Sequence, residues 1–196
     1  MSDKHSIRKA ILARLKALDA AQRESRGRRA VERLLAARAY LDAKTVMAYV
    51  SFGSEFPTDA LLQACFHDGK TLGLPRAHKD LSMTVHAVAH LDTDLERNAL
   101  GLQQPLGARP EIGVDRIGLV VTPGIAYDTK GNRLGRGAGY YDRFLSRFRA
   151  HSARPVICAL AFECQIVDAI IPQAHDCPLD MILTEDRTIQ IRGGAE

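Results

Sequence analysis

The stretch from Val121 to Leu145 reads VTPGIAYDTKGNRLGRGAGYYDRFL, and the rest of the chain is expected to be arranged around it. It begins at the end of an apolar run, IGLVV, which is typical of a buried strand of a parallel sheet. A glycine-rich loop follows and leads into YYDRFLSRF, where the spacing of Tyr141, Phe144 and Phe148 predicts one apolar helix face. A strand, a glycine-rich loop and a helix are therefore expected in succession.

The loop combines glycines with two arginines, Arg133 and Arg136. Glycine permits positive φ and a close approach of the backbone to a ligand, and the free N–H groups at a helix start attract anions. The loop matches neither the GxxxxGKS phosphate loop nor the GxGxxG dinucleotide fingerprint, and many glycine-rich loops are simple turns. We favour a phosphate site over a turn, because arginine can hold a phosphate through two hydrogen bonds and a helix begins directly after the loop.

The chain has 196 residues, with 46% hydrophobic and 26% charged, which is ordinary for a globular protein. This length favours one domain with its own core, so residues 1–196 are assigned to a single domain. The sequence has no run of eighteen apolar residues and no leader with a hydrophobic segment and a cleavage site. We therefore expect a cytoplasmic protein without a membrane partner.

The cysteines and histidines offer no obvious metal site. The four cysteines form no CxxC pair, which favours core thiols in a reducing compartment over disulfides or zinc. His86 and His90 lack Cys or carboxylate companions at ligand spacing, so packing or surface roles are preferred. The cysteines are Cys65, Cys158, Cys164 and Cys177.

The first part of the chain is basic, because residues 1–40 hold eleven Lys or Arg against four Asp or Glu, whereas the whole chain has a net charge of +4. Apolar spacing predicts two amphipathic helices, 4–18 and 20–39, which form an N-terminal helical hairpin. Asp19 and Gln22 have the spacing of a capping box for the second helix. The basic surplus could bind nucleic acid, but no aromatic residues interleave the charges, so a solvated face is the preferred interpretation.

The remaining sequence alternates apolar strand patterns with helical patterns, including a helix at about 58–68. Residues 92–113 are polar and rich in Gly and Pro, which indicates a surface loop or lid. The alternation predicts an α/β fold, a three-layer α/β/α arrangement with an open, Rossmann-like and largely parallel central sheet. Strands are expected at 45–52, 71–75, 81–88, 117–121, 154–162, 181–186 and 188–192.

Several charged residues follow these strands, and ligands of open α/β sheets collect beyond the carboxyl ends of the strands. Glu55, Arg76 and Glu163 each stand just after a predicted strand. Asp142 and Asp176 are candidate ligands of a hard cation, since Mg²⁺ beside nucleotide phosphates needs only one or two protein carboxylates. On spacing alone Asp142 could equally stabilise the helix N-terminus, and Asp176 by itself favours no metal site. The residues therefore indicate an anion-binding, and more narrowly a nucleotide-binding, α/β enzyme.

Beyond this point the sequence resembles a known family. PGIAYDTKGNRLGRGAGYYDRFL is very similar to the signature of the 5-formyltetrahydrofolate cyclo-ligases, also called methenyltetrahydrofolate synthetases. The resemblance covers almost the whole chain. It includes the early pair Lys4 and Arg8, the segment SFGSEFPT, LPR at 74–76, ALAF, and HDCPLDMILTE near the end.

The resemblance implies roles for individual residues. Lys4 and Arg8 match residues that contact ATP phosphates, Asp142 and Asp176 match positions associated with Mg²⁺, and Glu55 matches an acidic residue that binds the folate. Val50 and the segment 136–140 are expected to line the substrate pocket, with Arg136 and Tyr140 as catalytic residues. Ala138 stands where relatives carry a basic residue, and Leu100 where they carry an aromatic one. The implied nucleotide-binding loop consists of Arg133, Leu134, Gly135, Arg136, Gly137, Ala138, Gly139, Tyr140 and Tyr141.

The implied reaction is the cyclisation of 5-formyltetrahydrofolate to 5,10-methenyltetrahydrofolate with ATP and Mg²⁺, releasing ADP and phosphate. The expected partners are the reduced folate and ATP, with no nucleic acid and no membrane, and the expected state is a monomer. Two other classes remain open from the residues alone. A nucleotide- or phosphate-binding protein without catalysis would keep the loop, and a nucleic-acid binder would use the basic N-terminal hairpin.

Overall fold

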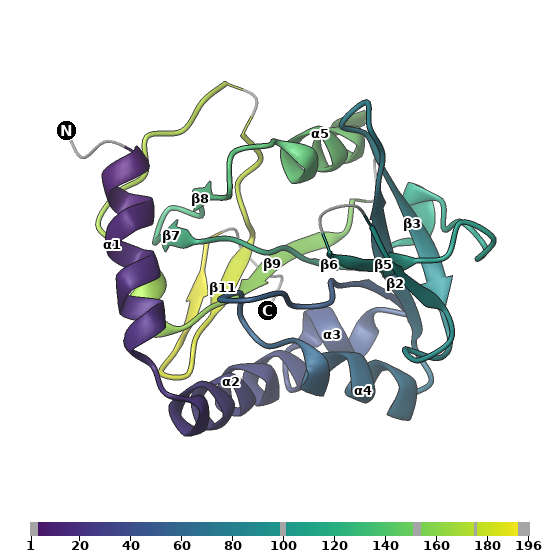
Figure 1. Ribbon diagram of the computed structural model, residues 1–196, viewed down its shortest axis with the longest axis horizontal. Coiled ribbons are helices and arrows are strands. Elements are labelled where there is room, and N and C mark those ends of the chain that lie inside the picture. Colours follow the sequence, from purple (N-terminus) through teal and green to yellow (C-terminus); the bar gives the residue numbers. More distant parts are fainter. Residues whose placement is uncertain (1–3, 99–100, 151–153, 175, 192–196) are drawn as a thin grey trace.

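The computed structural model describes residues 4–98, 101–150, 154–174 and 176–191. A seven-stranded sheet runs through its middle (Figure 1). Its strand order is β12 (Thr188–Gln190), β11 (Met181–Leu183), β9 (Val156–Leu160), β6 (Leu119–Val121), β1 (Thr45–Met47), β2 (Thr71–Ala77) and β3 (Met83–Val88). The five inner strands pair in parallel, and the two edge strands pair antiparallel. The predicted strands are all present, and the largely parallel central sheet is confirmed.

The sheet separates two hydrophobic cores. Successive side chains of a strand point to opposite faces, so Leu119 and Val121 of β6 join one core whereas Val120 joins the other. The same alternation divides β9, because Ile157 lies in one core and Cys158 in the other. Both faces of the inner strands are therefore buried, which explains why the sequence shows continuous apolar runs.

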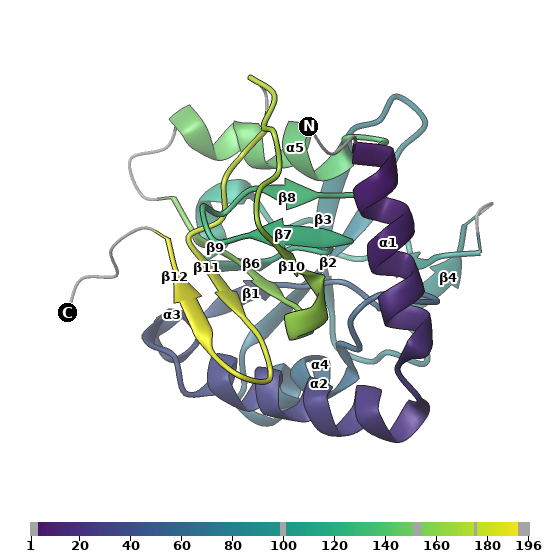
Figure 2. The ribbon, with the colours of Figure 1, turned by 90° about the vertical axis from the view of Figure 1, so that its left-hand side faces the viewer.

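Helices cover both faces of the sheet, as a three-layer arrangement requires (Figures 1 and 2). One face carries α2 (Ala20–Leu35), α3 (Arg38–Asp42) and α4 (Asp59–His67), and the other carries α5 (Tyr140–Ser146) with the short η2 (Arg147–Ala150). The predicted apolar helix face is buried through Phe144 and Leu145 of α5 and Phe148 of η2. The predicted α/β/α layering is thus confirmed.

The two N-terminal helices are both present, but they do not pack along each other as a hairpin would. The first, α1 (Lys4–Ala17), stands at one end of the sheet and packs on η3 (Glu163–Gln165) and a strand described below, whereas α2 packs on α3, α4 and β11 (Figure 2). The capping box is confirmed, because the Gln22 amide donates to Asp19 Oδ1 at 2.8 Å and the Asp19 amide to Gln22 Oε1 at 3.2 Å. The spacing of apolar residues predicts that each helix has an apolar face, but it does not show which element packs against that face.

The glycine-rich segment contains regular structure that the sequence analysis interpreted as loop. The strands β7 (Ala126–Asp128), β8 (Arg133–Leu134) and β10 (Ile166–Val167) form a small second sheet. Asp128 organises it, since its buried carboxylate accepts from the amides of Lys130, Asn132 and Ile170. Strands of two or three residues show no periodicity, and only their tertiary partners identify them.

Residues 92–113 also differ from a structureless loop. They hold a hairpin of β4 (Leu95–Arg97) and β5 (Gln103–Pro105), followed by the short η1 (Val114–Arg116). Arg76 at the end of β2 ties this hairpin down through an ion pair with Glu96 at 2.6 Å. Leu100 lies outside the described residues.

The cysteines are free thiols; three are buried and Cys164 is half-buried, as expected for core residues in this fold. Burial raises the pKa of the Cys65 thiol to about 11, so it stays protonated at neutral pH. None of the helices in the described part of the chain combines the length and the apolar character that crossing a bilayer requires.

Candidate functional site

The loop after β1 is held rigidly and presents Glu55. Thr58 is fully buried, and its hydroxyl donates to the Tyr49 carbonyl at 2.6 Å while accepting from the Ser51 amide at 3.2 Å. Glu55 is 19% exposed, and its Oε2 accepts from the Phe52 amide at 3.1 Å. Val50, the other residue implied here for the substrate, is half-buried at the base of this loop.

Glu55 meets the glycine-rich segment directly. Arg136 Nε donates to Glu55 Oε1 at 3.2 Å, although the two residues are 81 positions apart in the chain. Arg136 remains 55% exposed, so its guanidinium is still accessible to a ligand. Arg23 of α2 supports the other side of the loop by donating to the Glu55 carbonyl at 2.7 Å. The predicted folate residue and the predicted phosphate arginine are thus neighbours.

Three glycines of the segment adopt the positive φ that the sequence suggested, and the first of them is Gly131, with φ of 85°. Gly137 has φ of 109° and Gly139 has φ of 74°, and α5 begins directly after Gly139. The Ala138 carbonyl between them accepts from Arg143 Nη1 at 3.0 Å. A residue with a Cβ would be strained at either glycine. Gly135 has no positive φ, and a Cβ there would meet nothing within 4 Å.

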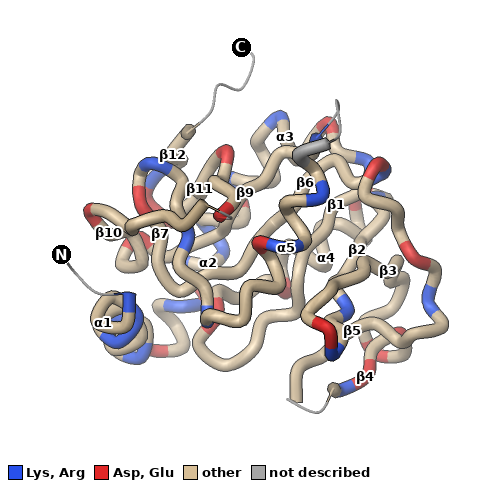
Figure 3. The backbone as a smooth tube through the Cα atoms, turned by 90° about the horizontal axis from the view of Figure 1, so that it is seen from above, with Lys and Arg blue, Asp and Glu red and all other residues tan. Residues whose placement is uncertain are grey.

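The start of α1 lies against the same segment. Arg8 Nε donates to the Gly135 carbonyl at 2.9 Å, and Lys4 Nζ lies 3.8 Å from Asp176 Oδ2. Lys and Arg positions are concentrated along α1 in the view from above (Figure 3). The structure therefore brings the two basic residues of α1 to the loop and to one of the candidate metal ligands.

The two candidate metal ligands lie near each other but are each paired with a cation. Asp142 Oδ1 is 2.6 Å from Arg133 Nη2, and Asp176 pairs with Lys4. Cys177 Sγ lies 3.9 Å from the Asp142 carbonyl oxygen, which places the Asp176 segment beside α5. Among the described residues, no three His, Cys, Asp or Glu side chains form a metal-binding group.

Three tyrosines lie close enough to Glu55 to feel its charge, and two of them, Tyr127 and Tyr141, also feel the charge of Arg133. Burial is the main cause that raises the pKa of Tyr49, Tyr127 and Tyr141, and the Glu55 carboxylate raises each of them further. These phenols are therefore neutral hydroxyls at physiological pH. Tyr49 lies in a predicted strand and Tyr141 on the predicted apolar face of a helix, whereas Tyr127 lies in the segment expected to be a loop.

Two further residues of the implied nucleotide-binding loop have contacts within the protein. The Tyr140 hydroxyl donates to the His78 carbonyl at 3.1 Å, which ties the start of α5 to the turn after β2. Leu134 is buried in the core, and its carbonyl accepts from the Ile125 amide, so its side chain does not face a ligand.

Two of the charged residues that follow predicted strands make contacts outside this site. Arg76 anchors the β4–β5 hairpin, and Glu163 accepts from Thr184 and pairs with Arg187 at 2.7 Å. His86 is buried and hydrogen-bonded to Thr84 at 2.9 Å, which agrees with a packing role.

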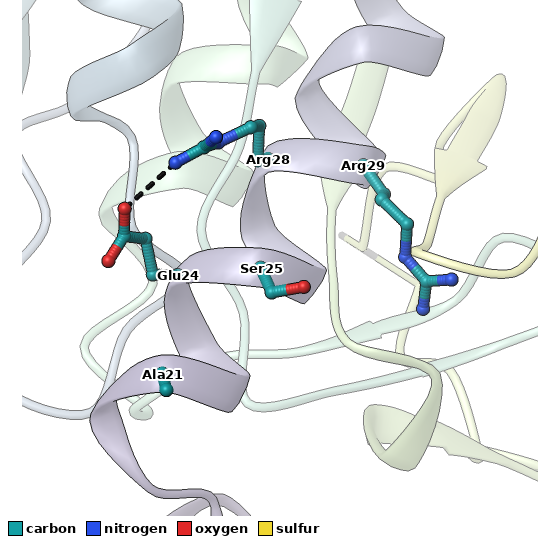
Figure 4. Close-up of a pocket in the computed structure, with 5 residues that line it drawn as sticks. All are labelled: Ala21, Glu24, Ser25, Arg28 and Arg29. Atoms are coloured by element: carbon teal, nitrogen blue, oxygen red, sulfur yellow. Dashed lines mark hydrogen bonds and ion pairs between the residues drawn. The ribbon is translucent and has the colours of Figure 1, made fainter.

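A shallow depression on the outer side of α2 lies across the sheet from α5 and carries none of these residues (Figures 1 and 4). Within it Arg28 pairs with Glu24 at 2.8 Å, one turn away on the same helix. The arrangement is that of a solvated helix surface. The lining residues are Ala21, Glu24, Ser25, Arg28 and Arg29.

Comparisons with known proteins agree with one another. Residues 1–185 match the sequence model of the 5-formyltetrahydrofolate cyclo-ligase family. The chain is 30% identical over 179 residues to the 5-formyltetrahydrofolate cyclo-ligase of Escherichia coli K12, covering 90% of this chain and 97% of that protein. It is 30% identical over 192 residues to that of Mus musculus, with 94% and 95% covered. The solved 5,10-methenyltetrahydrofolate synthetase of Aquifex aeolicus has a similar fold, with a TM-score of 0.83, 24% identity, and 98% and 95% of the two chains covered.

Proposed function

Because the chain belongs to the 5-formyltetrahydrofolate cyclo-ligase family, we infer that it closes 5-formyltetrahydrofolate to 5,10-methenyltetrahydrofolate with consumption of ATP. It is thus a ligase of folate one-carbon metabolism. The observation that supports the site assignment most directly is the contact between Arg136 and Glu55, which joins the glycine-rich segment to the loop after β1.

The chemistry explains the need for ATP. A formamide carbonyl is a poor electrophile, and its oxygen is a poor leaving group. Transfer of the γ-phosphoryl group to the formyl oxygen converts that oxygen into a good leaving group, and ADP departs with the electrons of the broken bond. N10 then attacks the formyl carbon and loses its proton, and the departing phosphate takes the C–O electron pair. This sequence needs alignment and charge neutralisation rather than a covalent protein nucleophile.

The protein offers suitable groups for these tasks. We assign Lys4, Arg8 and the segment 133–141 to the nucleotide, because the basic start of α1 and the glycine-rich backbone lie together. Glu55 is assigned to the folate, with Val50 beside it. Arg136 is the accessible cation between the two substrates, and Tyr140, in the same glycine-rich segment, is held by its hydrogen bond to the His78 carbonyl. Arg136 and Tyr140 are therefore proposed to contact the reacting groups.

The candidate metal ligands are carboxylate oxygens, which suit Mg²⁺. Asp142 and Asp176 provide two carboxylates beside the nucleotide segment, and a metal bound with nucleotide phosphates needs no more than these. Mg²⁺ held there would neutralise charge on the phosphate oxygens. Zinc fits less well, since the described residues show no cluster of three side-chain ligands.

We propose that the protein acts as a cytoplasmic monomer, with neither nucleic acid nor a membrane as partner. The ion pair of Arg28 with Glu24 and that of Arg29 with Asp186 leave the basic face of α2 partly neutralised, which disfavours a polyanion site. A relative from Arabidopsis thaliana is named as mitochondrial, so the compartment is tested by microscopy of the tagged protein.

The direct test is to incubate the purified protein with 5-formyltetrahydrofolate, ATP and Mg²⁺ and to follow methenyltetrahydrofolate by its near-ultraviolet absorbance. We expect product to form at the rate of ADP release. Tight ATP binding by well-folded protein without an absorbance rise would instead identify a non-catalytic nucleotide-binding protein. Steeply salt-dependent affinity for RNA or DNA would identify a nucleic-acid binder.

A further inference from the structure

Two buried hydrogen-bond donors of the site have no acceptor among the described residues. They are Nη1 of Arg133 and the hydroxyl of Tyr141. The Arg133 side chain is only 4% exposed, so solvent does not readily satisfy its guanidinium. Burying a donor without an acceptor costs free energy, and folded proteins rarely keep such groups unless another molecule supplies the acceptor.

The position of the Arg133 guanidinium is fixed by its surroundings. Its Nη2 is held by Asp142 at 2.6 Å, and its central carbon lies 5.7 Å from the centre of the Tyr141 ring. Its stem passes over Gly124, where a Cβ would come within 2.9 Å of Arg133 Cγ and 2.7 Å of the Tyr127 hydroxyl oxygen. The guanidinium therefore cannot turn to another acceptor without breaking the pair with Asp142. Donors fixed in this way act without reorganisation when an acceptor arrives.

These donors lie between the two halves of the proposed site. On one side Arg133 holds Asp142, which is assigned to the metal and nucleotide. On the other side is Glu55, assigned to the folate, which the ion pair with Arg136 at 3.2 Å joins to the same glycine-rich segment. A group that passes from ATP to the folate has to cross this region.

We propose that Arg133 Nη1 and the Tyr141 hydroxyl form an oxyanion site for the phosphoryl group in transit, a refinement that rests on the proposed function. In this step a bond forms between the formyl oxygen and the γ-phosphorus. The bond from that phosphorus to the β–γ bridging oxygen breaks, and its electron pair leaves with ADP. The two donors bind non-bridging oxygens of the phosphoryl group, and neither residue gains or loses a proton. They stabilise the transition state rather than bound ATP, so they act on kcat.

The sharpest variant is Tyr141→Phe, which removes only the hydroxyl. Its matched control is Tyr40→Phe, because the buried Tyr40 hydroxyl has an acceptor and donates to Asp68 at 2.7 Å. Without ligands, Tyr141→Phe should unfold at the same or a higher denaturant concentration than the wild type. Tyr40→Phe should unfold at a lower one. Loss of stability in Tyr141→Phe equal to that of the control would show that the hydroxyl already has a partner, and would overturn the proposal.

Binding and turnover supply the second readout. Tyr141→Phe should lower kcat by about 100-fold, the usual effect of removing one oxyanion donor, with less than a twofold change in the Kd of ADP and Mg²⁺. Adding aluminium fluoride, a mimic of the phosphoryl group in transit, should raise the melting temperature of wild type with ADP and Mg²⁺, and this increment should disappear in the variant. An unchanged kcat, or a loss of ADP affinity as large as the loss of kcat, overturns the oxyanion site.

Arg133→Lys is the second variant, because one ammonium group cannot serve both Asp142 and the phosphoryl group. It should lose the aluminium fluoride increment as well, and retention of the full increment contradicts the proposal. Failure of the wild type to form methenyltetrahydrofolate would reject the proposed function itself. Normal wild-type turnover with unaffected variants would reject only the oxyanion site.

Discussion

Arg8 in the first helix donates from Nε to the carbonyl of Gly135 at 2.9 Å, across 127 positions of the chain. This contact fastens α1 to the glycine-rich segment, and it ties the position of Lys4, one turn earlier, to the same place. Arg8→Ala should therefore destabilise the fold by about 1 kcal/mol, the usual net value of a partly buried hydrogen bond. It should also raise the KM for ATP more than the KM for the folate. Both effects are measured by denaturant unfolding and steady-state kinetics.

Lys9→Ala is the matched control, since Lys9 is an exposed cation on the same helix. It should change stability and both KM values little. An equal rise of the ATP KM in both variants would mean that the general charge of α1, rather than the Arg8 contact, attracts the nucleotide.

Gly139→Ala should destabilise the ligand-free protein by roughly 1–2 kcal/mol, because Gly139 has φ of 74°, a conformation that costs other residues about that much. The new Cβ would also lie 3.1 Å from Arg143 Nη1. Gly135→Ala is the control within the same segment, since Gly135 lacks positive φ and has open space around its Cα. Equal unfolding midpoints for the two variants would contradict this distinction.

Asp142→Asn should depress turnover most at low Mg²⁺ and recover partly as Mg²⁺ is raised, because an amide is a weaker ligand for a hard cation than a carboxylate. Titration of activity with Mg²⁺ measures this shift. Asp186→Asn is a suitable control, since Asp186 forms an exposed pair with Arg29 on the opposite side of the molecule from α5. Full activity of Asp142→Asn at every Mg²⁺ concentration would remove Asp142 from the metal site.

The sheet and its helices could be predicted because their residues carry strong local patterns. The apolar runs of β6 and β9, and the spacing of Phe144 in α5 and Phe148 in η2, follow from burial on defined faces. The short strands β7, β8 and β10 could not be predicted, since strands of two or three residues show no periodicity, and β10 pairs with β7 more than thirty residues earlier in the chain. The direction in which α1 packs was missed for the second of these reasons.

In the site, residue types could be predicted but their pairing could not. The sequence identified Glu55, Arg136 and Asp142 as candidates, partly through the family resemblance. That Arg136 contacts Glu55, and that Arg133 holds Asp142, depends on distances between segments that fold together only in the finished structure. The buried donors of Arg133 and Tyr141 have no signal in the sequence at all, since an unpaired donor is a property of the packing.

Asp128→Ala should be among the most destabilising substitutions outside the cores. The carboxylate is fully buried and accepts from three backbone amides and from Asn132 Nδ2, so its loss leaves several buried donors unpaired. We expect a loss of about 3 kcal/mol or more in the free energy of unfolding, measured in urea. Asp42→Ala, at an exposed ion pair with Arg38, should change it by less than about 0.5 kcal/mol.

Asp94 should make part of the stability depend on acid pH. The amides of His90 and Ala89 donate to its carboxylate, and with Arg109 nearby they lower its pKa below the usual value. A group whose pKa is lowered by folding stabilises the protein above its unfolded pKa of about 3.9, and this contribution is lost as pH falls through the lower folded pKa. Asp94→Asn should therefore be less stable than wild type at pH 7, and the difference should shrink as pH falls below about 4. Urea unfolding from pH 7 to pH 3 measures this difference, and a constant difference over the whole range would show that the carboxylate charge is not its cause.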